Sequence, residues 1–293
     1  MQSPIPGDLS GFARRPRGPL KSVALRYNWT VNEPSIGPCA LCGTVGPLKL
    51  SHIIPRWMYR RLLHTSPNST PSSLIRVDPD ARSATFSSKQ NYERLLCGKC
   101  EGRFGVWEAY VSKVAVQQDG TFPALAQTTD IWRPPATKIW SVGSAAALDC
   151  DAITKFAVSV VWRSGVSSGR PRVELGPYEP VMAAYLLGTA PFPPAATLLV
   201  QFFAVRADVR TDRSIQHAST DRAEGYHAHT WGGCGFRFSL LVGAQVPAFP
   251  GISFEKTRTV IISNGDDLLA TMRSIHRLAV PMGRLAKLAP VCH

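Results

Sequence analysis

Cys39-Ala-Leu-Cys42 and Cys97-Gly-Lys-Cys100-Glu101 are the two stretches that decide the fold of the N-terminal half. In each stretch two residues separate the thiols, so both sulfurs can face one ion across a tight turn, and Gly43 and Gly98 supply the backbone freedom that such turns need. Two such pairs in one chain are typical of a four-cysteine zinc site. The alternative is four buried free cysteines, for which the paired spacing would be a coincidence. The sequence therefore predicts a structural, tetrahedral Zn²⁺ bound by Cys39, Cys42, Cys97 and Cys100.

Between the pairs lies the stretch Leu48-Lys-Leu-Ser51-His52-Ile53-Ile54-Pro55. With the pairs, it resembles the HNH (ββα-metal, or His-Me finger) endonucleases in their zinc-bound treble-clef form. In that family a His-hydrophobic-hydrophobic-Pro stretch follows the first cysteine pair, and a Leu-Leu-Cys-x-x-Cys stretch opens the final helix, as at Leu95–Cys100. The resemblance covers roughly 75 residues, Cys39 to Val114. It implies a β-hairpin whose first strand carries the general base, packed on a helix that helps to hold a divalent metal ion.

The resemblance also implies roles for single residues. His52 matches the general base of the family, and Ser51 stands where many members have a metal-binding Asp or His. Asn91 lies near the middle Asn of the family, one residue further from the cysteine than the pattern has it. Glu101 follows the last cysteine, where His or Asn is usual. His52, Asn91 and Glu101 are thus the expected catalytic residues.

Glu101 and Asn91, with Ser51, are the expected ligands of a catalytic Mg²⁺ or Mn²⁺. A carboxylate oxygen suits these hard ions, whereas a serine hydroxyl is a poor ligand that would only orient a metal-bound water. The alternative for Glu101 is a structural role, in which its charge favours the dipole at a helix N-terminus. We expect Glu108, seven residues further on, to be an ion-pair partner rather than a ligand.

The net charge is +13, and residues 1–120 hold 16 Lys/Arg against 8 Asp/Glu. A basic excess of this kind favours a polyanionic partner through counterion release, so we expect nucleic acid, most simply DNA. The expected contacts lie in the Pro/Gly-rich arm 1–34 and on a short helix predicted over 56–63; they are Arg14, Arg15, Arg17, Lys21, Arg56, Arg60 and Arg61. The alternative is that both segments are simply solvated.

The predicted fold class is α+β, with the arm 1–34, a treble-clef zinc domain over 35–118, a linker over 119–136 and a mixed α+β C-terminal domain over 137–293. A Ser/Thr/Pro-rich loop is predicted over 65–88, and a helix from Cys100 with Phe104, Trp107, Val111 and Val114 on its apolar face. Further helices are predicted over 152–163, 178–187 and 266–278, and strands over 197–206, 235–246 and 257–263. His217, His227, His229 and Cys234 match no defensible metal motif, which favours a Gly-rich polar loop over a second metal site.

The composition is 44% hydrophobic and 18% charged, as in globular proteins. No apolar run approaches 18 residues and no signal-like stretch opens the sequence, so we expect no membrane span and a cytoplasmic, bacterial location. Seven cysteines, four of them in close pairs, suit a reducing compartment and metal binding better than disulfides.

Two functional hypotheses follow. The first is a metal-dependent nuclease that cleaves DNA, with RNA as the second substrate class, in bacterial defence or a mobile element as is usual for similar modules. The C-terminal domain would then position the substrate or bind a protein partner. The second hypothesis is a catalytically inactive zinc module that binds nucleic acid or a partner protein; the departures at Ser51 and Glu101 favour it.

Overall fold

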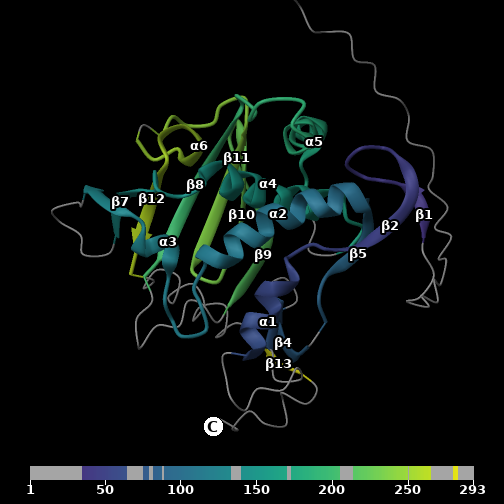
Figure 1. Cartoon of the computed structure of the whole chain (residues 1–293), viewed down its shortest axis with the longest axis horizontal. Coiled ribbons are helices and arrows are strands. Elements are labelled where there is room, and N and C mark those ends of the chain that lie inside the picture. Colours follow the sequence, from purple (N-terminus) through teal and green to yellow (C-terminus); the bar gives the residue numbers. More distant parts are fainter. Residues whose placement is uncertain are drawn as a thin grey trace, which may run out of the picture. The chain divides into compact units, whose positions relative to one another are not determined.

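The computed structural model describes residues 35–64, 75–78, 82–87, 89–132, 140–169, 173–204, 214–249, 251–264 and 280–282. The basic arm, with Arg14, Arg15, Arg17 and Lys21, and the helix predicted over 266–278 lie outside the described residues. Contacts group Pro34–His293 into one compact unit. The described residues of this unit form an α+β structure, as predicted, with three sheets and several helices (Figure 1).

The cysteine pairs belong to a three-stranded antiparallel sheet with the order β1-β2-β5, which comprises β1 (Ile36–Pro38), β2 (Val45–His52) and β5 (Tyr92–Cys97). The register of β2 on β5 sets Leu48 opposite Cys97 and His52 opposite Tyr92. Helix α2 (Gly98–Val114) follows β5 directly. Its buried residues include Phe104, Val111 and Val114, which confirms the predicted helix and its apolar face. Helix α1 (Arg56–His64), also predicted, follows β2.

The larger part of the unit is a seven-stranded sheet with the order β6-β7-β12-β8-β11-β10-β9. Its neighbours are antiparallel except β8 and β12, which are parallel. The strands are β6 (Thr129–Trp132), β7 (Trp140–Ser144), β8 (Ala196–Phe203), β9 (Ile215–Ala223), β10 (Tyr226–Gly233), β11 (Phe236–Gly243) and β12 (Thr259–Ser263). The three C-terminal strands predicted from the sequence correspond to β8, β11 and β12.

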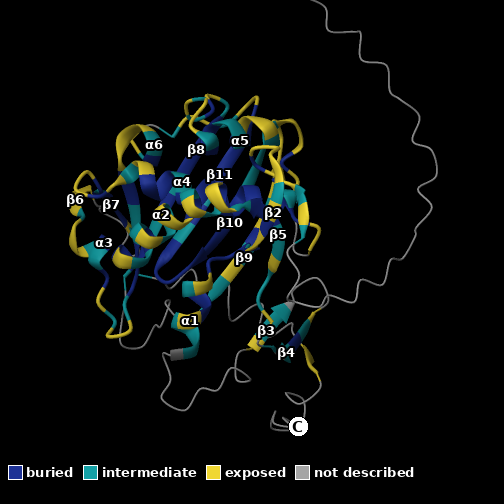
Figure 2. Ribbon diagram, turned by 45° about the vertical axis from the view of Figure 1, so that its right-hand side comes forward, coloured by how far each residue is buried: buried dark blue, intermediate teal, exposed yellow. Residues whose placement is uncertain are grey.

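Helix α4 (Cys150–Val166) is the central helix of the unit and extends the one predicted over 152–163. Asp149 caps it by accepting a hydrogen bond from the amide of Ala152 at 2.9 Å. Every residue from Ala152 to Gly165 except Lys155 is buried, as expected for a helix that is covered all round. Helix α4 packs against α2 and against the sheet, and Figure 2 shows the buried residues concentrated in α4 and in the central strands.

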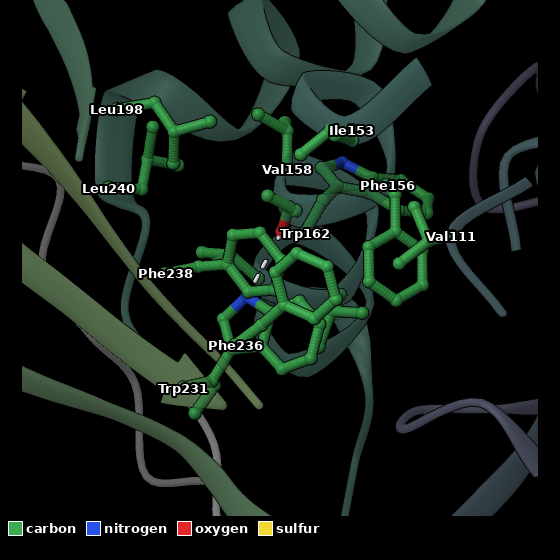
Figure 3. Close-up of a cluster of buried hydrophobic side chains, with 14 of the residues drawn as sticks. Val111, Ile153, Phe156, Val158, Trp162, Leu198, Trp231, Phe236, Phe238 and Leu240 are labelled. Atoms are coloured by element: carbon green, nitrogen blue, oxygen red, sulfur yellow. Dashed lines mark hydrogen bonds between the residues drawn. The ribbon is translucent and has the colours of Figure 1, made fainter. Parts of the chain in front are cut away.

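An aromatic cluster joins α4 to the sheet (Figure 3). The ring of Phe156 lies 5.4 Å from that of Trp231 and 5.9 Å from that of Phe238, centroid to centroid. The indole Nε1–H of Trp231 donates a hydrogen bond to the carbonyl of Ala157 at 3.2 Å, so its one polar atom is satisfied inside the core. The same hydrophobic cluster includes Cys39 and Cys100, so the cysteine half and the sheet half share one core.

The remaining elements are short. They are α3 (Pro123–Ala126), a 3₁₀ turn (Gly176–Tyr178), α5 (Glu179–Leu187), α6 (Phe254–Thr257), and a small sheet of β3 (Ile75–Asp78), β4 (Ser83–Phe86) and β13 (Val280–Pro281). Helix α5 confirms the helix predicted over 178–187, and it ends at Gly188 with a φ of 73°, a left-handed conformation that favours glycine. Within the described part of the chain, no helix combines the length and apolar character of a membrane span.

Two predictions of irregular structure were wrong in part. The loop predicted over 65–88 contains β3 and β4, which pair with each other. The linker predicted over 119–136 contains α3 and β6, and β6 is an edge strand that pairs with β7. These strands are short, and they are completed by pairing: β3 with β4 inside the predicted loop, β4 also with β13, and β6 with β7.

Candidate functional site

The four predicted zinc ligands converge. The sulfurs of Cys39, Cys42, Cys97 and Cys100 all lie within 4.8 Å of one another. The sulfurs of Cys42 and Cys97 are 3.8 Å apart. Tetrahedral coordination with Zn–S bonds of about 2.3 Å places two sulfurs about 3.8 Å apart, so the spacing fits zinc. These four cysteines could therefore bind a metal ion such as zinc.

The local chain geometry explains the convergence. Between β1 and β2 the chain turns tightly: the amide of Gly43 donates to the carbonyl of Cys39 at 2.8 Å, and Gly43 has a φ of 73°. Hydrogen bonds from Thr44 lower the pKa of Cys42 to about 6, which favours the thiolate that a metal requires. Burial raises the pKa of Cys100, so that thiol depends on a bound cation to lose its proton.

Ser51 and Glu101 meet where β2 passes the first turn of α2. The Ser51 hydroxyl, fully buried, donates a hydrogen bond of 2.6 Å to Oε2 of Glu101. Burial raises the pKa of Glu101, while the bond from Ser51 and the charge of Arg163 oppose that rise. Two of the three residues that the resemblance offered as metal ligands are thus in direct contact with each other.

His52 is the last residue of β2 and is half-buried. Its Nε2 lies 3.1 Å from Oε1 of Gln90. In the tautomer with the proton on Nε2, this nitrogen donates to the amide oxygen, and Nδ1 of the neutral ring keeps its lone pair. Burial is the largest cause that lowers the pKa of His52, and the charge of nearby Arg56 adds to it. The lowered pKa favours the neutral ring, and Gln90 orients it. No sequence pattern singled out Gln90.

Asn91 lies on the chain that approaches β5. Its main-chain carbonyl accepts a hydrogen bond from the amide of Ile53 at 2.9 Å, which continues the pairing of β2 and β5 one residue beyond His52. Asn91 is thus close to His52 along the opposite strand. Glu108, on α2, forms the expected ion pair: its Oε1 lies 2.8 Å from an Nη of Arg163.

The three arginines of α1 differ in their surroundings. Arg56 and Arg60 are exposed. The guanidinium of Arg61 donates to the carbonyls of Val116 and, at 2.6 Å, Ser112, and it lies over the ring of Trp57 at 4.9 Å. Arg61 therefore ties α1 to the end of α2, whereas the other two arginines of the helix, Arg56 and Arg60, face solvent.

The stretch with His227, His229 and Cys234 was predicted to be a loop, and that prediction was wrong. His227 and His229 lie on β10, which pairs with both β9 and β11. Nδ1 of the buried His229 lies 2.9 Å from the hydroxyl of Thr220. Among the described residues, the four cysteines are the only group of three or more His, Cys, Asp or Glu placed to share an ion.

His229 makes a testable contribution to stability. Burial lowers its pKa to about 4, below the ordinary value of about 6.5, so the folded state holds it neutral. Below pH 6.5 the unfolded chain takes up a proton at this residue more readily than the folded chain does. The free energy of unfolding therefore falls by roughly 3 kcal/mol as the pH drops from 6.5 toward 4. We expect His229→Gln to lose less of its free energy of unfolding between pH 7 and pH 4.5 than wild type does, as measured by urea denaturation. His227→Gln, at a half-buried neighbour, is the matched control; equal acid sensitivity in all three proteins contradicts the assignment.

Searches against protein-family models, curated proteins and solved structures found no match to this chain.

Proposed function

We propose that the protein is a metal-dependent nuclease that hydrolyses phosphodiester bonds in DNA, with RNA as the second substrate class. The observation that carries the proposal is the half-buried imidazole of His52, which is held by Gln90 and follows Ser51, the residue whose hydroxyl bonds to the Glu101 carboxylate. The resemblance in sequence supports the same function. Its usual settings extend the proposal to bacterial defence or a mobile element, in the cytoplasm.

In this mechanism Nδ1 of His52 accepts the proton of the attacking water, while Gln90 holds the ring through Nε2. Glu101, with Asn91 and Ser51, would hold a Mg²⁺ or Mn²⁺ ion. A small number of protein ligands is enough for Mg²⁺. The ion is usually bound through one or two carboxylates, together with waters and substrate phosphates. When bound, the ion supplies positive charge that stabilises the developing charge on the phosphate oxygens. Zinc at the four cysteines would be structural, because thiolates fill all four of its positions.

A specific observation favours a second candidate function. Ser51 and Glu101 hydrogen-bond to each other at 2.6 Å, so part of the expected ligand set is already engaged. A catalytically inactive zinc module that binds nucleic acid or a partner protein needs nothing more from these residues than that structural bond. In both candidates the basic excess of the chain supports a nucleic-acid partner.

Incubation with supercoiled plasmid separates the two functions. We expect wild type to nick or linearise the plasmid with Mg²⁺ or Mn²⁺ and to be inactive in EDTA. His52→Ala, purified in the same way, controls for contaminating nucleases and should be inactive. DNA binding without cleavage under every divalent ion would favour the inactive module.

DNA binding is expected to weaken with salt because Arg56 and Arg60 contact phosphates. Each lost phosphate contact lowers the slope of log affinity against log salt by about 1, so Arg56→Gln/Arg60→Gln should lower it by up to about 2. The slope is measured by fluorescence anisotropy with a labelled duplex between low and moderate salt. Arg222→Gln, at an exposed arginine of β9, is the matched control. An unchanged slope in the double variant would show that α1 does not contact the backbone.

A further inference from the structure

Arg163 is a fully buried arginine at the centre of the unit. It belongs to α4, and its side chain is 1% exposed. Arginine is almost never buried to this extent unless each part of its guanidinium has a partner. One Nη donates a hydrogen bond of 2.6 Å to the main-chain carbonyl of His52. The other lies 2.8 Å from Oε1 of Glu108. Nε donates to the carbonyl of Ser159 at 3.3 Å, and the guanidinium carbon lies 5.3 Å from the ring centre of Phe104.

The packing of α4 does not by itself call for a charge at this position. The residues around Arg163 on α4 are buried and uncharged, and the helix is held on the sheet by aromatic contacts such as that of Phe156 with Trp231. Burying an ion pair costs about as much desolvation free energy as the attraction returns, so an apolar pair of similar size is often no less stable. The Arg163–Glu108 pair is therefore poorly explained by stability alone.

A guanidinium can do what an apolar side chain cannot: it donates a hydrogen bond to one oxygen while its charge pairs with a second. The two oxygens are the carbonyl of His52, on β2, and the carboxylate of Glu108, on α2. These are the two elements that also carry the Ser51–Glu101 contact. Strand β2 ends at His52, so Arg163 holds the main chain at the point where strand pairing stops.

A second bond links the same helix to the partner strand. The amide of Ser168, just beyond the end of α4, donates to Oε2 of Glu93 on β5 at 2.8 Å. Glu93 is the register partner of Ser51. The C-terminal end of α4 thus contacts both strands of the β2–β5 pair, at positions 52 and 93.

We propose that Arg163 is a positioning residue for the reaction centre: it fixes the main chain at His52 so that the imidazole keeps its place relative to Glu101. The inference rests on the proposed nuclease function. It means that a residue from the region beyond residue 137 helps to position the reaction centre. Three groups then hold His52: Gln90 holds the ring, the pairing with β5 holds the strand, and Arg163 holds the carbonyl.

Arg163→Lys tests the inference. The lysine ammonium keeps the charge that pairs with Glu108, but it is too compact to reach the carbonyl of His52 at the same time. We expect kcat for plasmid cleavage to fall about 100-fold with little change in KM, as for a small misplacement of a reacting group. Zinc content and the thermal midpoint should stay close to those of wild type. Arg103→Lys is the matched control, since Arg103 also donates to main-chain carbonyls, those of Leu186 and Leu187, but ties α2 to α5. It should leave kcat unchanged.

Hydrogen–deuterium exchange supplies a readout that does not depend on activity. The amide of Ile53, bonded to the carbonyl of Asn91, reports on the end of the β2–β5 pair. We expect exchange in residues 50–55 to rise about tenfold in Arg163→Lys and not in Arg103→Lys. If Arg163→Lys does not fold, the double variant Glu108→Gln/Arg163→Met replaces it, because it leaves no unpaired buried charge. Its exchange in residues 50–55 is then compared with that of Arg103→Lys.

The outcomes separate the two proposals. Faster exchange at residues 50–55 together with the loss of kcat supports the positioning role. A folded Arg163 variant with wild-type exchange there overturns that role, whether or not the protein cleaves DNA. A wild-type protein that cleaves nothing refutes the nuclease function, and the positioning role for catalysis with it, even where exchange shows that Arg163 restrains His52.

Discussion

Cys97→Ser is expected to release the metal and to unfold the sheet formed by β1, β2 and β5. A structural zinc site contributes its binding free energy to folding, about 10–16 kcal/mol in small zinc domains, which matches or exceeds the whole stability of a typical domain. The outer part of this sheet buries little, since Ile36 is 72% exposed and Val45 is 70% exposed. Side-chain burial there cannot replace the metal.

The measurement is zinc content by mass spectrometry together with a thermal melt. Purified wild type should carry about one Zn²⁺ per chain. Cys150→Ser is the matched control: the Cys150 thiol donates to the carbonyl of Ala145 at 3.3 Å, a bond that a serine hydroxyl can also make. It should keep its zinc and its thermal midpoint. Folded wild-type protein that contains no zinc would refute the four-cysteine assignment.

The second large effect is expected at His52 and Glu101. Loss of a general base lowers the rate by about 10²–10⁴-fold, so His52→Ala should abolish plasmid cleavage while it leaves Mn²⁺ binding in place. Glu101→Ala should abolish both cleavage and Mn²⁺ binding, because its carboxylate is the strongest expected ligand. Zinc content should be unchanged in both variants. Mn²⁺ binding is measured by electron paramagnetic resonance, and Glu174→Ala, at an exposed carboxylate paired with Arg222, is the control.

A purely structural Glu101 predicts a different result. If the residue only favours the helix dipole, Glu101→Ala should cost roughly 0.5–1 kcal/mol of stability and cleave almost as fast as wild type. Glu101→His, which introduces the commoner family residue, separates the cases further. A ligand role predicts retained activity with a shift in preference toward Ni²⁺ or Co²⁺, since imidazole suits those ions. Full activity of Glu101→Ala at saturating Mg²⁺ would mean that the ion is held elsewhere.

Several features could be predicted because their causes are local. The spacing within each cysteine pair reflects the geometry of metal coordination, and all four sulfurs do converge. The apolar face of α2 and the helix around Ala152–Arg163 follow from the 3.6-residue period, which repeats within one segment. Glu108 was expected to be an ion-pair partner, and it is one, although the sequence did not identify Arg163 as its partner.

Other features depend on contacts between distant parts of the chain. Gln90 meets His52 across 38 residues, and Arg163 meets it across 111. Arg61 was grouped with two solvent-facing arginines because a helical pattern shows which side is polar, but not that the carbonyls at the end of α2 lie within its reach. Strand β4 gains a distant partner in β13, and the edge strand β6 is completed by β7.

The sequence by itself thus determined where a metal ion could bind and which segments are helical, since coordination spacing and helical periodicity act over a few residues. Only the tertiary structure decided how His52 is held. Its carbonyl accepts a hydrogen bond from Arg163, and its ring lies against Gln90. The preceding residue, Ser51, donates to Glu101, so three separate segments meet at this point. Such bonds form only when the buried core brings α4, α2 and β2 together, and no periodic pattern along the chain encodes them.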